Sequence, residues 1–167
     1  NSLIFKPAMI ITAILLIMYW MNIKKLIQKI IFDHKHLNKI FYCGIGSAIF
    51  LILHSVFLGI KFDINLLKLL RRIVLLSFII LEITAQAYLI FLLYEIKSKI
   101  NTIIDIRILR LKRILVTILI ITAILIGPFL PFSNLKVLKH MIEWNYLLGV
   151  ILFYFLTFLM WKNKKIN

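Results

Sequence analysis

The stretch of sequence that decides the fold is residues 73–95, IVLLSFIILEITAQAYLIFLLYE. A helix needs about 20 apolar residues to cross a bilayer, and this stretch is long enough, yet it carries Glu82 and Gln86 near its middle. An ionisable side chain at membrane depth costs at least about 2.5 kcal/mol, so it is retained where protein groups compensate it. Residues four apart share one face of a helix. We therefore predict that this face of the helix turns toward protein and carries a polar site.

The composition of the whole chain excludes a soluble globular domain. Of its 167 residues, 63% are hydrophobic, and the apolar runs are separated by short basic segments. The net charge of +15 does not indicate nucleic-acid binding, because Lys and Arg lie in clusters between apolar runs, where the positive-inside rule places them. With Cys43 as the single cysteine, a disulfide within the chain is impossible. We predict an all-α, polytopic integral membrane protein whose partner is the lipid bilayer, with no nucleic acid.

Four further apolar runs accompany residues 73–95. Pro7 suits the first turn of a helix, and Trp20, Trp144 and Trp161 stand near the ends of apolar runs, as interfacial aromatic residues do. The predicted spans are residues 8–22, 40–60, 73–95, 114–130 and 144–161. We predict that residues 1–167 form one transmembrane helical domain of about five helices.

The basic residues predict the orientation of these spans. Loops 23–39 and 96–113 and the tail after residue 161 hold fourteen Lys and Arg residues, against seven on the other side of the membrane. The richer side is expected to be cytoplasmic, which puts the N-terminus outside and the C-terminus in the cytoplasm. A bacterial inner membrane or an organelle's inner membrane fits this bias. Because the chain begins with Asn1, not Met, we expect a cleaved upstream segment or a longer natural chain.

Depth along the helices suggests which polar residues meet. At about 1.5 Å per residue, His54 lies about 9 Å inside the outer end of its span, and Glu82 lies about 14 Å inside the outer end of residues 73–95. These side chains can therefore meet in the outer half of the membrane, with one residue of the last span at the rim. The predicted ligand-binding residues are Glu82, Gln86, His54, Ser55 and Asn145.

Two functions from different classes fit this cluster. In the first, Glu82 is central to a cluster that handles a protonatable or polar ligand, as a carrier or a transporter component. In the second, the chain is a non-catalytic accessory subunit that packs in a larger membrane complex, with Glu82 and Gln86 bonded to a partner helix. A weaker third hypothesis is a lipid or quinone enzyme that uses Glu82 as an acid or base. No phosphate loop, nucleophile elbow or zinc motif appears, so the sequence favours a non-enzymatic role.

Other residues of the span 40–60 predict packing and not a cofactor. Gly44, Ala48 and Gly59 fall on one stripe, which permits close approach of a second helix. His54 invites a haem interpretation, but the other histidine on that side, His140, lies near the membrane interface, and one ligand does not make a site. We predict no haem, no other cofactor and no metal.

Within the basic stretch from Lys97 to Arg113, basic and apolar residues alternate at roughly helical spacing between Ile103 and Arg113. Thr102, followed by Asp105 three residues later, is typical of a helix N-terminus. The stretch is expected either to bind anionic lipid or a partner's acidic surface, or to serve only to orient the chain in the membrane.

Overall fold

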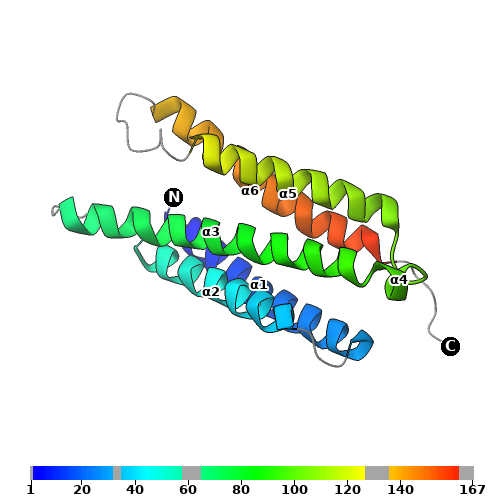
Figure 1. The fold of residues 1–167 in the computed structure, drawn as a ribbon. Coiled ribbons are helices and arrows are strands. Elements are labelled where there is room, and N and C mark those ends of the chain that lie inside the picture. Colours follow the sequence, from blue (N-terminus) through cyan, green and yellow to red (C-terminus); the bar gives the residue numbers. More distant parts are fainter. Residues whose placement is uncertain (1, 32–34, 58–64, 127–135, 162–167) are drawn as a thin grey trace. The chain divides into compact units, whose positions relative to one another are not determined.

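The computed structural model of the chain describes residues 2–31, 35–57, 65–126 and 136–161, and within them the fold is all-helical (Figure 1). A backbone in lipid must satisfy its own hydrogen bonds, so apolar runs of this length fold as helices. The helices of the described part are α1 (Ser2–Ile30), α2 (Lys35–Phe57), α3 (Asn65–Glu95), α4 (Lys97–Ile100), α5 (Ile106–Ile126) and α6 (Lys136–Met160).

Three helices in the described part of the chain are long and apolar enough to cross a membrane. They are Lys6–Ile30, His36–Phe57 and Leu69–Glu95, and a shorter apolar stretch covers Leu148–Met160. The prediction of an all-helical membrane protein is confirmed at this level. The count of five spans and the orientation of the termini stay predictions.

Several helices extend beyond the predicted spans. The predicted loop 23–39 is wrong in its first part, because α1 continues to Ile30. The physical reason is that Ile23 and Ile27, one turn apart, are buried, so the apolar face of the helix continues past the predicted end of the span. Both α5 and α6 begin eight residues before the predicted spans 114–130 and 144–161.

The chain forms two compact units, Asn1–Leu92 and Leu93–Asn167. The prediction of one domain over residues 1–167 stays a prediction. In the first unit α1 and α2 lie side by side (Figure 1). Trp20 is 1% exposed and its indole packs directly on Gly44, where a Cβ would overlap the ring. The large ring is therefore buried within the protein, against a position without a side chain, and the interfacial depth predicted for Trp20 stays a prediction.

In the second unit α5 and α6 lie side by side (Figure 1). Gly149 of α6 packs against Leu119 of α5, whose Cδ2 would lie 2.6 Å from a Cβ at the glycine. The N-terminus of α5 is capped by Asp105, whose Oδ1 accepts a hydrogen bond of 2.8 Å from the backbone N–H of Arg107. The backbone N–H of Asp105 donates to the carbonyl oxygen of Met160 at 2.9 Å, which joins the start of α5 to the end of α6.

Candidate functional site

Glu82 of α3 is fully buried and is held from its own helix by Gln86. The exposed fraction of both side chains is 0%. Gln86 Nε2 donates a hydrogen bond of 2.9 Å to Glu82 Oε1. This is the contact that helical spacing predicts for polar residues four apart. The sequence therefore located the polar face of α3 correctly.

The second oxygen of Glu82 is held by a residue of another helix. Ser47 of α2 is also 0% exposed, and its Oγ lies 2.7 Å from Glu82 Oε2. Ser47 Oγ lies 2.8 Å from the backbone carbonyl oxygen of Gly44 as well. Ser47, Glu82 and Gln86 form what we call the Glu82 cluster, which joins α2 to α3 within the first unit.

The sequence did not indicate Ser47, because depth was compared from residue 73, where the predicted span begins. The helix itself begins at Asn65, so Glu82 lies about 25 Å from the start of α3. Ser47 lies two turns before His54 on α2, farther than His54 from the end of that helix at Phe57.

The other predicted ligand-binding residues lie in different surroundings. His54 is half-buried on α2. Ser55 is 1% exposed, and its hydroxyl donates to the carbonyl oxygen of Ile52 in its own helix at 2.8 Å. Asn145 is exposed on α6, in the second unit. A ligand-binding role for these three residues stays a prediction.

The predicted packing stripe of α2 is described in part. Gly44 is buried under Trp20, and Ala48 is 0% exposed. Gly59 lies outside the described residues. Close approach of α1 and α2 at Gly44 is the structural counterpart of the small-residue pattern in the sequence.

Two buried polar atoms near the Glu82 cluster have no hydrogen-bond partner among the residues that the structure describes. They are Gln86 Oε1 and the indole Nε1 of Trp20. Gln86 contributes its amide nitrogen to Glu82, and Trp20 packs on Gly44, whose carbonyl oxygen contacts Ser47. A buried donor or acceptor left unsatisfied costs about 1–3 kcal/mol, so each unpaired atom is a place where a polar ligand or water would be stabilised.

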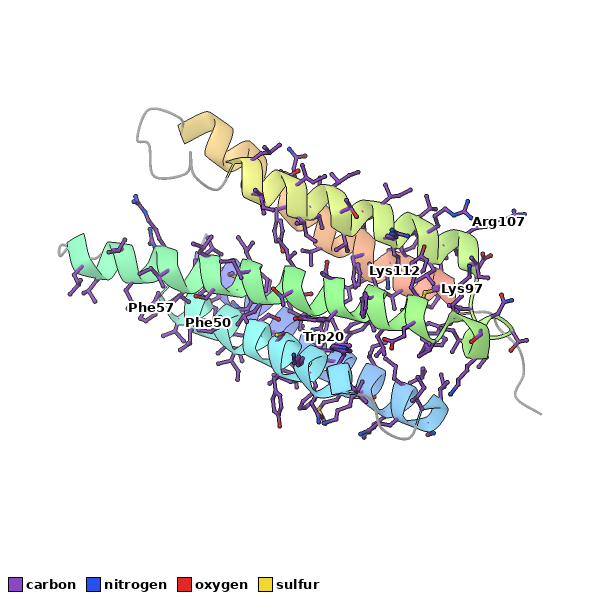
Figure 2. All side chains as sticks on the ribbon, in the orientation of Figure 1. Trp20, Phe50, Phe57, Lys97, Arg107 and Lys112 are labelled. Carbon is purple, nitrogen blue, oxygen red and sulfur yellow. The ribbon has the colours of Figure 1, made fainter. Side chains whose placement is uncertain are left out.

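A second buried polar cluster lies between α5 and α6 (Figure 2). Lys112 is 0% exposed; its Nζ donates a hydrogen bond of 2.6 Å to Thr157 Oγ1 and lies 4.0 Å from the centre of the Phe153 ring. Thr157 Oγ1 donates in turn to the carbonyl oxygen of Phe153 at 2.8 Å. Lys112 lies before the predicted span 114–130, and burial lowers the pKa of its ammonium group to about 7.

By its residue type alone, Lys112 is one more basic residue of the stretch 97–113. Its neighbours on the helix face give the missing signal, because Leu109 and Val116 stand three residues before it and four after it, and both are buried. By contrast, Arg107 and Arg110 are exposed. Binding of anionic lipid by the exposed part of this stretch stays a prediction.

Within the described ranges, no group of three or more His, Cys, Asp and Glu side chains is arranged to hold a metal ion. No family model matches the chain, and no curated protein or solved structure matches it significantly.

Proposed function

We propose that the chain is a small integral membrane protein that carries a proton, or a solute that moves with a proton, by means of the Glu82 cluster. The observation that carries the proposal is a fully buried carboxyl group in an apolar helix, with an unpaired amide oxygen beside it. Ionisable residues inside membrane helices mark ion and proton pathways more often than they serve packing.

The contacts of Glu82 favour a role in proton carriage over a role that only joins two helices. A polar contact that only joined helices would be expected to satisfy every buried donor and acceptor, since a hydrogen bond between membrane helices contributes only about 0.6 kcal/mol on average. Here the buried amide oxygen of Gln86 has no hydrogen-bond donor among the described residues. Both oxygens of Glu82 also have hydrogen-bond partners inside the chain, Ser47 and Gln86. Glu82 therefore does not need a partner subunit to complete its hydrogen bonds.

The test is proton entry into vesicles that contain the purified chain. A pH-sensitive dye inside the vesicles reports the rate at which the interior acidifies after the outside is made more acidic than the inside. We expect the unmodified chain to acidify the interior faster than empty vesicles do, and Glu82→Gln to reduce the rate to that of empty vesicles. Glu95→Gln is the matched control, because Glu95 is exposed at the end of the same helix. Equal rates for the unmodified chain and Glu82→Gln would refute the proposal.

Assembly distinguishes the accessory-subunit hypothesis. The unmodified chain and Glu82→Gln are purified from native membranes, and the proteins that co-purify with each are compared. If Glu82 serves to carry protons, we expect the same proteins to co-purify with the unmodified chain and with Glu82→Gln. Loss of co-purifying subunits with Glu82→Gln, together with no proton entry for the unmodified chain, would favour the accessory role.

A further inference from the structure

The two short contacts of Ser47 Oγ determine where a proton must lie. Its distances to the carbonyl oxygen of Gly44 and to Glu82 Oε2 are 2.8 and 2.7 Å, both within the range of O–H···O hydrogen bonds. A hydroxyl group carries one proton and can donate one such bond at full strength. The carbonyl oxygen of Gly44 has no proton to give. When Ser47 donates to the carbonyl oxygen of Gly44, the proton of its contact with Glu82 Oε2 comes from Glu82.

We propose that Glu82 rests as the neutral carboxylic acid and donates its own O–H to Ser47. The chain of donors is then complete: Glu82 Oε2–H donates to Ser47 Oγ, and Ser47 Oγ–H donates to the carbonyl oxygen of Gly44. Gln86 Nε2 donates to Glu82 Oε1, which is the carbonyl oxygen of the acid. This inference names the proton as the ligand of the Glu82 cluster, and it rests on the proposed function for the role of that proton in transport.

Full burial agrees with this assignment. A carboxylic acid carries no net charge, and it has one donor and one acceptor that neighbouring side chains can satisfy. Ser47 accepts from that donor, and Gln86 donates to that acceptor. The neutral form therefore uses both oxygens of Glu82 with the partners that the helices α2 and α3 provide.

Release of the proton would require Ser47 to change partner. When the O–H bond of Glu82 breaks, the proton passes to water, and the electron pair stays on Oε2. Ser47 then turns its hydroxyl proton from the carbonyl oxygen of Gly44 to the carboxylate, without any movement of oxygen atoms. Ser47 is therefore a positioning residue. Its hydroxyl proton points to the carbonyl oxygen of Gly44 when Glu82 is protonated and to Glu82 when Glu82 is ionised. Gly44 is also the residue on which Trp20 packs.

Infrared spectroscopy of the full chain in lipid at neutral pH tests the assignment. A protonated carboxyl group has a C=O stretching band well separated from those of carboxylates and amides. We expect this band in the unmodified chain and not in Glu82→Gln, whereas Glu95→Gln should retain it. Ser47→Ala should shift the band to higher frequency, because the acid loses its acceptor, and Ser47→Thr should restore the original frequency.

Labelling the chain with ¹³C-glutamate gives a measurement that does not depend on the folding of Glu82→Gln. The isotope should shift the band in the unmodified chain and in Ser47→Ala. A spectrum without a protonated glutamate band would overturn the inference, and so would a band that Ser47→Ala leaves unchanged. A protonated glutamate in a chain that passes no protons would overturn the proposed function alone. Proton entry through a chain whose Glu82 is ionised would overturn only this inference.

Discussion

Replacement of Lys112 by Met should change how the stability of the chain depends on pH. The side chain of Lys112 is fully buried between α5 and α6 against Thr157 and Phe153. Methionine has a similar length, carries no charge and adapts to irregular apolar surroundings. The substitution therefore removes one titrating group with little change in packed volume.

The size of the effect follows from proton binding in the folded and unfolded chain. Burial lowers the pKa of Lys112 from 10.5 to about 7. Between these pH values the unfolded chain holds a proton that the folded chain lacks, so the free energy of unfolding rises with pH. The rise is up to about 1.4 kcal/mol per pH unit, or roughly 2–3 kcal/mol over two units within this range. Below about pH 7 both states hold the proton, and the cost of burying the charge is fully present.

The assay is equilibrium unfolding of the purified chain by SDS in mixed micelles, between about pH 7.5 and 9.5, a range that lies within the window of the linkage. We expect Lys112→Met to be more stable than the unmodified chain at the lower pH, with a difference that shrinks as the pH rises. Lys99→Met is the control, because Lys99 is exposed. Parallel pH curves for the unmodified chain and Lys112→Met would show that the folded chain does not keep Lys112 out of water.

Two further substitutions test the packing of the units. Gly44→Val should destabilise the first unit by about 1–3 kcal/mol, because its side chain would overlap the indole of Trp20, and a lower midpoint of thermal unfolding would show this. Asp105→Ala should cost about 1 kcal/mol, because the backbone N–H of Arg107 loses its cap. Thr102→Ala, at the exposed residue that the sequence pattern indicated, should leave the midpoint unchanged; an equal loss there would contradict the observed cap.

The features that the sequence predicted well are those set by local spacing. Hydrophobicity over 73–95 predicted a helix of membrane length, and α3 contains all of it. The four-residue interval between Glu82 and Gln86 predicted that they share one buried face of the helix, and their hydrogen bond of 2.9 Å agrees with this. Both results depend only on the period of the α-helix and on the cost of polar groups in an apolar medium.

The features that the sequence did not predict depend on where helices begin and how they pack. Ser47 was not predicted because its contact with Glu82 depends on how α2 packs against α3, which begins eight residues before the predicted span. The burial of Trp20 was not predicted, because it depends on a contact with Gly44 on a different helix. The burial of Lys112 was not predicted, because Lys112 belongs to a stretch of basic residues although its face of α5 is apolar. Tertiary contacts decide each of these cases.

The central claim is that Glu82 takes up and releases a proton. The most direct test is to measure how many protons the purified chain binds. The unmodified chain and Glu82→Gln, both in detergent, are titrated in parallel with acid and base across the pH range in which the fold persists. The account predicts one proton fewer per chain for Glu82→Gln, and the same number for Ser55→Ala, whose hydroxyl bonds only within its own helix among the contacts described. Equal proton counts for the unmodified chain and Glu82→Gln would contradict the account.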